Sequence, residues 1–164
     1  MSQQALNIAI LTVSDTRTPD TDTSGQTLVD RVQAAGHQLA ERRLVKDDLF
    51  HIRAIVADWI HQPGVQVVLI TGGTGFAARD VTPDAIGPLL VDEIPGFGEL
   101  FRQLSYQEVG SSTIQSRAVA GLANRTMVVA LPGSTGACRT AWDHILKDQL
   151  DSTHKPCNFV DQLL

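Results

Sequence analysis

The sequence predicts one domain, residues 1–164, of the α/β class: a three-layer α/β/α sandwich with a mostly parallel central sheet. Three short apolar runs carry this prediction, at residues 7–14, 65–70 and 126–131. Such runs are typical of strands that helices cover on both faces. Segments with helical spacing separate the runs, and strands that alternate with helices favour parallel pairing.

The first strand, residues 7–14, leads into a polar loop and then a helix that continues to about Ala35. Thr23 or Ser24 is predicted to cap this helix, because either hydroxyl can accept a hydrogen bond from a free N–H group of the first turn. Gly36 follows the helix in a position that favours a left-handed residue.

A second strand is expected at residues 37–45, where apolar and polar residues alternate. Asp47 and Asp48 then cap a helix over residues 49–61, which Pro63-Gly64 stops. One apolar stripe with helical spacing indicates the face of this helix that packs on the sheet. The residues of the stripe are Ile52, Ile55, Val56, Trp59 and Ile60.

After the third strand, a helix is expected at residues 82–91, with Pro83 in its first turn, where the missing N–H is no loss. Residues 95–98 are predicted to form a turn, and helical spacing resumes at residues 99–108. A further short helix is expected at residues 112–120.

The last strand, residues 126–131, is followed by a helix over about residues 135–150 with small and aliphatic residues on its apolar face. Cys138 on this helix is interpreted as a small core residue. The tail from Asp151 onward is expected to pack as an irregular cap.

The composition excludes several classes of protein. The net charge of −5 argues against a general nucleic-acid surface, which needs clustered Lys and Arg. Neither a run of about 18 apolar residues nor a leader at Met1 is present, so we expect no membrane span and no secretion. Cys138 and Cys157 are interpreted as reduced thiols of a cytoplasmic protein. The five histidines show no metal-ligand spacing.

The loop after the third strand is the most informative stretch, and it reads Thr71-Gly72-Gly73-Thr74-Gly75. A strand that ends in such a loop leaves backbone N–H groups free at the carboxyl edge of the sheet, where open α/β sheets bind ligands. Such N–H groups suit phosphate oxygens. The loop is neither a Walker A motif nor a Rossmann fingerprint. A tight strand-to-helix turn is the alternative, but the threonine hydroxyls and a downstream carboxylate favour a ligand loop.

Two carboxylates follow two of the predicted strands. Asp80 lies in the approach to the helix at Pro83, and Asp47 ends the second strand. Each could simply cap a helix. Because Mg²⁺ takes one or two carboxylates together with phosphate oxygens, the pair also fits a site that faces bound phosphates.

A second small-residue loop repeats this pattern after the last strand, and it reads Pro132-Gly133-Ser134-Thr135-Gly136. Two such loops can form opposite walls of one crevice. Further small hydroxyl groups follow the first strand, in Ser14-Asp15 and in Thr23-Ser24-Gly25. Elsewhere, Ser116-Arg117 offers a positive fork for a phosphate, although an exposed helix charge explains the arginine equally well.

Together these motifs resemble the MoaB/MogA family of molybdenum-cofactor biosynthesis proteins, and the likeness covers nearly the whole chain. It is closest to the MoaB branch, because of Ala141-Trp142 and the tail at 156–159. The blocks that carry the resemblance are Thr71 to Gly75, Arg79 to Ala85, Pro95 to Glu99, Ser116-Arg117 with Ala120-Gly121, and Leu131-Pro132-Gly133.

The resemblance implies a molybdopterin-binding fold that assembles into homotrimers or homohexamers. It also implies an enzyme that uses Mg²⁺ and ATP to adenylylate molybdopterin and releases pyrophosphate, with a molybdate-insertion enzyme as a further partner. The family's two essential aspartates map onto Asp47 and Asp80, which would also contact Mg²⁺ through the phosphates. Its pterin-binding serine maps onto Ser116. The remaining residues expected to bind substrate or nucleotide are Ser14, Asp15, Ser24, Gly25, Thr71, Gly72, Gly73, Thr74, Gly75, Glu99, Arg117, Pro132, Gly133, Ser134 and Thr135.

Two departures from the family pattern keep a second hypothesis open. Ser134-Thr135 follow Pro132-Gly133 where adenylyltransferase members usually carry Pro-Gly-x-Pro, and Lys46 stands where a proline commonly precedes the first aspartate. The alternative is a protein that binds molybdopterin or its precursor without turnover. The presence of both aspartates favours the enzyme. Metal insertion is a third, less favoured function.

Overall fold

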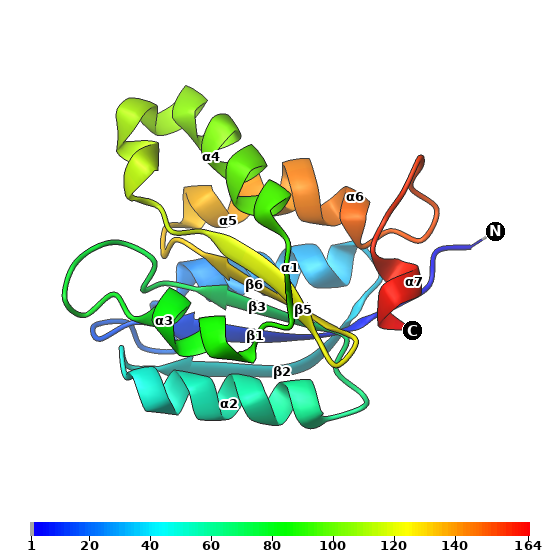
Figure 1. The fold of residues 1–164 in the computed structure, drawn as a ribbon, viewed down its shortest axis with the longest axis horizontal. Helices are drawn as coiled ribbons and strands as arrows, with labels where there is room; N and C mark the ends of the chain where they lie inside the picture. The colour runs from blue at the N-terminus through cyan, green and yellow to red at the C-terminus, as the bar shows by residue number, and fades with distance from the viewer. Residues whose placement is uncertain (1) are drawn as a thin grey trace.

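A computed structural model describes residues 2–164. Met1, at which we expect no leader to begin, lies outside the described residues. Six strands form one mixed sheet in the order β2-β1-β3-β6-β5-β4 (Figure 1). Pairing is parallel between β1 and β2, between β1 and β3, and between β3 and β6. The bounds of these parallel strands are β1 Asn7–Val13, β2 Gln38–Val45, β3 Val67–Thr71 and β6 Thr126–Leu131. The predicted α/β class and the mostly parallel sheet are confirmed.

Helices cover both faces of the sheet, and a separate apolar core fills each side. Leu28, Phe101 and Trp142 lie in the core under α1 (Thr23–Ala34), α4 (Pro95–Val109) and α5 (Thr135–Ala141). Ile52 and Ile86 lie in the other core, under α2 (Leu49–His61) and α3 (Thr82–Ile86). Figure 1 shows α2 and α3 on one side of the sheet and α1, α4 and α5 on the other. This is the predicted three-layer arrangement.

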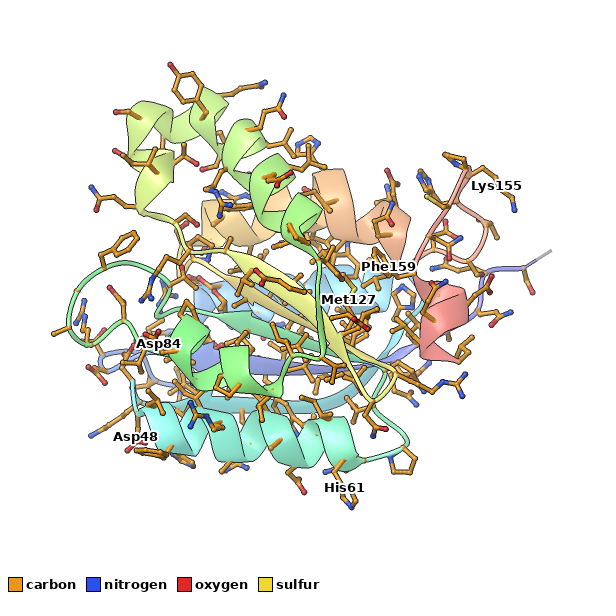
Figure 2. All side chains as sticks on the ribbon, viewed as in Figure 1. Asp48, His61, Asp84, Met127, Lys155 and Phe159 are labelled. Carbon is orange, nitrogen blue, oxygen red and sulfur yellow. The ribbon has the colours of Figure 1, made fainter. Side chains whose placement is uncertain are left out.

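The two helices of the N-terminal half match their predicted positions. They are α1, Thr23–Ala34, and α2, Leu49–His61, whose ends are marked by Asp48 and His61 in Figure 2. Asp48 caps α2 by accepting a hydrogen bond from the N–H of His51 at 2.8 Å. The cap of α1 differs from the prediction: Asp22, rather than Thr23 or Ser24, accepts from the N–H of Gly25. Its carboxylate reaches that N–H while the two hydroxyls bond elsewhere.

The helix predicted at residues 82–91 is shorter in the structure. Helix α3 is Thr82–Ile86, and a 3₁₀ turn over Gly87–Leu89 follows. Pro88 has no N–H to continue the helical hydrogen bonds, so the regular helix ends before it. Asp80 does not cap this helix, since no side chain does.

The turn predicted at residues 95–98 is wrong, because these residues begin α4, Pro95–Val109. Pro95 fits the first turn of a helix, where its missing N–H costs nothing. Phe97 is buried in the same core as Phe101 and stacks on it with ring centroids 6.3 Å apart. Two glycines in four residues are a pattern typical of a turn. The segment is nevertheless part of the helix, because the ring of Phe97 is buried in the core.

The helix predicted at residues 112–120 is also wrong. A 3₁₀ segment, Gly110–Gln115, is followed by a strand, β5, Val119–Ala123. It runs antiparallel to β6 and to the two-residue strand β4, Asp92–Glu93. Asn124 and Arg125 both have positive φ and close the hairpin between β5 and β6. A two-residue turn with this conformation matches the twist of a hairpin.

The C-terminal helix extends as predicted, but it contains one irregular turn. It consists of α5, Thr135–Ala141, a π-helical turn over Trp142–Leu146, and α6, Lys147–Gln149. The tail is mostly irregular and ends in a short helix, α7, Val160–Leu163. No helix among residues 2–164 is both long enough and apolar enough to cross a membrane.

Candidate active site

A cavity of about 610 Å³ lies at the carboxyl ends of β1, β3 and β6. This edge of the sheet is where parallel α/β folds bind ligands. The cavity is lined by groups from each of the predicted loops together with part of α4. Among its lining residues are Ser14, Asp15, Asp47, Thr71, Gly72, Gly73, Thr74, Gly75, Asp80, Ser116, Pro132, Gly133 and Ser134. Folding thus brings together most of the candidate residues that lie far apart along the chain.

The Gly/Thr loop, Thr71 to Gly75, needs glycine at two positions. Gly72 and Gly73 have φ values of +110° and +70°, which other residues rarely adopt. A side chain on Gly73 would also lie 3.1 Å from a carboxylate oxygen of Asp47 and against the hydroxyl of Thr82. The buried hydroxyl of Thr82 donates to the carbonyl oxygen of Gly72 at 2.8 Å. These contacts hold the loop in one conformation beside the carboxylates.

The second loop is fixed from behind by hydroxyl groups. Thr71 donates from Oγ1 to the carbonyl oxygen of Pro132 at 2.9 Å. Ser24 donates from Oγ to the carbonyl oxygen of Gly133 at 2.7 Å. Ser134 caps α5 by accepting from the N–H of Ala137. The hydroxyl of Thr135 lies 3.1 Å from that of Thr23.

Three carboxylates gather at one end of the cavity. The backbone N–H of Asp47 donates to Asp15 at 3.0 Å, and Asp80 accepts from the N–H of Ala77 at 3.0 Å. Burial raises the pKa of Asp47 above its ordinary value, and the negative charges of Asp15 and Asp80 raise it further. A cation placed here would relieve this repulsion.

The carboxylates alone do not form a complete metal site. Within residues 2–164, no three His, Cys, Asp or Glu side chains lie close enough to hold an ion. Asp47 and Asp80 are nevertheless of the type that Mg²⁺ uses when phosphate oxygens supply its other ligands. The donor set therefore fits a magnesium ion that arrives with a phosphorylated ligand.

Ser116 and Arg117 lie in the wall between this cavity and a neighbouring hollow. Ser116 lines both. Its hydroxyl is the one buried side-chain oxygen or nitrogen of residues 2–164 that has no hydrogen-bond partner. A buried polar group without a partner is costly, so a ligand that bonds to this hydroxyl would recover that free energy.

Arg117 does not line the main cavity. Its Nε donates to the carbonyl oxygen of Gly75 at 3.0 Å, and Nη2 donates to the carbonyl oxygen of Asp80 at 2.7 Å. Nη1 lies 3.4 Å from the carboxylate of Asp84. The guanidinium is therefore bound to the protein through all three nitrogens, and the predicted phosphate fork is not what the side chain forms.

A model of a probable molybdopterin binding domain matches residues 9–152. The chain belongs to this family. The matched span contains both cavity loops and all three carboxylates, so the family likeness includes the candidate site. The predicted resemblance to the MoaB/MogA proteins is thus confirmed.

Relatives and solved structures agree with this family. Molybdenum cofactor biosynthesis protein B of Escherichia coli (strain K12) is 55% identical over 156 residues, which cover 95% of this chain and 92% of the relative. The protein of the same name from Bacillus cereus is 46% identical over 142 residues, 86% of this chain and 84% of the relative. A crystal structure of a molybdenum cofactor biosynthesis protein B superposes with a TM-score of 0.88 at 44% identity, covering 92% and 94% of the two chains.

Several candidate residues lie outside the main cavity. Ser24 supports the second loop from behind, through the carbonyl oxygen of Gly133 and the hydroxyl of Thr135. Gly25 donates its N–H to Asp22 in the cap of α1. Glu99 is exposed on α4 and lines the neighbouring hollow instead. The family block at Pro95 to Glu99 predicts Glu99 in the site, but in the structure it does not line the main cavity.

Sequence reasoning missed two cations that line the cavity, Arg17 and Arg79. Arg17 donates from Nη1 to the hydroxyl of Thr23 at 2.8 Å, so it lies over the first turn of α1. The positive charge of Arg79 lowers the pKa of Asp47, against the effect of burial. The pair Arg79-Asp80 was visible in the sequence, but only the fold brings Arg17 to the same edge of the sheet.

Sequence reasoning also missed Asp22, which is buried. Its carboxylate accepts from the hydroxyl of Thr12 at 2.7 Å and pairs with Arg42 at 3.0 Å. Thr12 lines the cavity, so Asp22 fixes one wall of the candidate site to β2. The spacing of Asp22 from Ser24-Gly25 was the available signal.

Proposed function

We propose that this protein takes part in molybdenum cofactor biosynthesis by transferring an adenylyl group from Mg-ATP to molybdopterin. The observation that supports this most directly is that Asp47 and Asp80 line the same cavity as the Gly/Thr loop. The family match and the names of the relatives from Escherichia coli and Bacillus cereus support the pathway.

The proposed reaction needs no nucleophile from the protein. An oxygen of the terminal phosphate of molybdopterin attacks the α-phosphorus of ATP. The bond from this phosphorus to the bridging oxygen breaks, and pyrophosphate leaves with the bonding electrons. Catalysis of such a transfer depends mainly on positioning and on neutralising charge. A cavity made of glycine N–H groups, hydroxyls, carboxylates and arginines is suited to that task.

Asp47 and Asp80 would hold the Mg²⁺ that accompanies ATP, together with phosphate oxygens. When bound, the ion neutralises the negative charge of the phosphates. Arg17 and Arg79 are the cavity's cations and would bind phosphate oxygens directly. Ser116 would donate its unpaired hydroxyl to the pterin substrate, which would supply the partner that this buried group lacks.

Binding of molybdopterin without turnover is the second candidate function. The second loop favours it, because the hydroxyls of Ser134 and Thr135 bond within the protein rather than standing free. Ser134 caps α5, and Thr135 contacts Thr23 and Ser24. Both candidates use the same cavity, so only a measurement of product separates them.

The test is to incubate the protein with molybdopterin, ATP and Mg²⁺ and to measure both adenylyl-molybdopterin and pyrophosphate. We expect both products from the wild type. Asp80→Asn should abolish turnover while molybdopterin still binds, because the pterin contacts lie elsewhere in the cavity. Asp58→Asn is the matched control, since Asp58 is exposed on α2 and should leave turnover unchanged. Binding without product in the wild type would establish the second candidate, and full activity in Asp80→Asn would contradict the assigned role.

Three further parts of the proposal concern the surroundings of the enzyme. We place it in the cytoplasm, in agreement with two cysteines that are both free thiols. We expect a homotrimer or homohexamer in solution, which light scattering of the purified protein would measure. A molybdate-insertion enzyme would receive the adenylylated product.

A further inference from the structure

Four consecutive carbonyl groups of the Gly/Thr loop are each bound by one of two residues. Thr82 donates from Oγ1 to Gly72 at 2.8 Å and from its N–H to Gly73 at 3.0 Å. Arg117 donates from its N–H to Thr74 at 2.9 Å and from Nε to Gly75 at 3.0 Å. The carbonyl groups of residues 72–75 are therefore all bound to the protein.

This arrangement fixes the direction of the loop's N–H groups. In a planar trans peptide, the N–H of a residue points opposite to the carbonyl of the residue before it. Bound carbonyls at 72–75 thus turn the N–H groups of 73–76 away from Thr82 and Arg117. Within residues 2–164, none of these N–H groups donates to a protein acceptor. Because Gly73, Thr74 and Gly75 line the main cavity, their N–H groups are available to an anion there.

The surroundings of Arg117 hold its guanidinium in place on the far side of the loop. Nη2 donates to the carbonyl oxygen of Asp80 at 2.7 Å, so the side chain joins both ends of the turn between Gly75 and Asp80. Its guanidinium carbon lies 5.1 Å from the ring centroid of Phe76. Only a planar group with several N–H donors can make these contacts at once.

We infer that Arg117 is a positioning residue, which holds the Gly/Thr loop so that successive backbone N–H groups bind the phosphate oxygens of the substrate. This inference rests on the proposed function in one respect, namely that a phosphate anion occupies the cavity. The role differs from that of a phosphate ligand, because the positive charge of Arg117 is directed to carbonyls of the loop rather than to the anion. The shape of the side chain then matters more than its charge.

Lysine at this position separates the two roles. Arg117→Lys keeps the positive charge but cannot bond to Gly75 and Asp80 with a planar fork. Arg117→Gln removes the charge. A positioning role predicts that both variants bind inorganic pyrophosphate about tenfold or more weakly, because hydrogen bonds to a charged group are lost. If Arg117 instead bound the anion directly through its positive charge, the lysine variant would retain most of the affinity for pyrophosphate.

Arg53 provides a matched control. It donates from Nε and Nη2 to the carbonyl oxygens of Ala85 and Asp84 at 2.8 and 2.9 Å, and it lies over the ring of Phe50. Arg53 lines neither of the two larger hollows. Arg53→Lys should therefore lose a similar set of contacts and leave pyrophosphate affinity unchanged.

The measurement is a titration of each full-length protein with inorganic pyrophosphate, followed by calorimetry and by the backbone amide signals of residues 73–75. We expect these signals to shift in the wild type and in Arg53→Lys, and to shift much less in Arg117→Lys. Unchanged affinity in Arg117→Lys would overturn the inference. If pyrophosphate does not shift these signals even in the wild type, the anion site of the proposed function is itself wrong.

Thr82 gives a second measurement if Arg117→Lys does not fold. Thr82→Val removes the hydroxyl that bonds to Gly72 and keeps the shape of the side chain, whereas Thr82→Ser keeps the hydroxyl. We expect weaker pyrophosphate binding in the valine variant and its recovery in the serine variant. Equal affinity in the two variants would contradict the view that bound carbonyls orient the loop.

Discussion

The hydroxyl of Ser24 donates a hydrogen bond of 2.7 Å to the carbonyl oxygen of Gly133, so the first turn of α1 is joined to the loop after β6. The neighbouring carbonyl, of Pro132, is bound in the same way by Thr71. Both cavity loops therefore have their carbonyl groups bound from behind. In the second loop this turns the N–H groups of Gly133 and Ser134 away from those hydroxyls.

Ser24→Ala should lower the free energy of unfolding by about 1 kcal/mol, the usual net value of one intramolecular hydrogen bond. Pyrophosphate binding should weaken as well, because the second loop loses a contact that orients it. Urea denaturation and calorimetry measure the two effects. Thr27→Ala is the control: Thr27 bonds to a carbonyl within α1 and lies away from the loops. If Ser24→Ala bound pyrophosphate as well as Thr27→Ala, the second loop would not depend on this contact.

Gly73→Ala should nearly abolish pyrophosphate binding. The residue has a φ of +70°, and a methyl group there would lie against Thr82 and 3.1 Å from Asp47. Gly36→Ala has a comparable φ of +84° with no atom within 4 Å of the added carbon. Both variants should lose about 1 kcal/mol or more of stability, because alanine is strained in the left-handed conformation. Only Gly73→Ala should lose pyrophosphate binding. Equal loss of binding in both would indicate a general effect on folding.

Asp15→Asn should lower the pKa of Asp47. Burial is the main reason that this pKa is raised, and the charge of Asp15 is the next. The asparagine keeps an oxygen that can accept the N–H of Asp47 while removing the charge. The pKa should thus move toward its ordinary value without reaching it, and carbon NMR of the carboxyl groups would follow this. Asp20→Asn, an exposed change in the same loop, should have no effect. An unchanged pKa in Asp15→Asn would mean that the carboxylates do not interact.

Acid should destabilise the fold through His37. This residue is buried and accepts the N–H of Leu6 at Nδ1, at 3.2 Å, which requires that nitrogen to be unprotonated. Burial lowers the pKa of His37 below 6.5, its ordinary value, and the charge of Asp151 only partly opposes this. The unfolded chain therefore binds the proton more readily, so this contribution is complete above the unfolded pKa and is lost as the pH falls below it.

Urea midpoints between about pH 8 and pH 5 would measure the effect of His37. In His37→Asn the slope of stability against pH should be smaller in this range, since asparagine does not titrate. His61→Asn, a change at the exposed end of α2, serves as the control and should keep the wild-type slope. A slope that is the same in all three proteins would rule out His37 as its source.

The two cysteines should differ sharply in reactivity. Cys138 is buried, and burial raises the pKa of its thiol to about 11. Cys157 is exposed. At about pH 8, iodoacetamide should modify Cys157 in the folded protein and Cys138 only after denaturation, because the thiolate is the reactive form. Peptide mapping by mass spectrometry would locate the label. Rapid labelling of Cys138 in the folded state would show that the core around the last helix opens readily.

Local patterns were reliable where one residue type has one main use. The apolar runs at 7–14 and 126–131 are strands, and Gly36 has the positive φ expected of it. They were misleading where a segment's partner decides its conformation. The helix predicted at residues 112–120 overlaps the start of Val119–Ala123, which pairs along β6 and is a strand.

The sequence by itself determined the class of fold, the two small-residue loops and the carboxylates at Asp47 and Asp80. These follow from local chemistry: apolar runs must be buried, and glycine permits turns that other residues resist. Only the tertiary structure decided which way the side chains near the cavity point. Arg117 could have faced an anion or the protein, and it faces the carbonyl groups of the Gly/Thr loop. A guanidinium binds whichever acceptors lie within its reach, and those acceptors are set by segments distant in the chain.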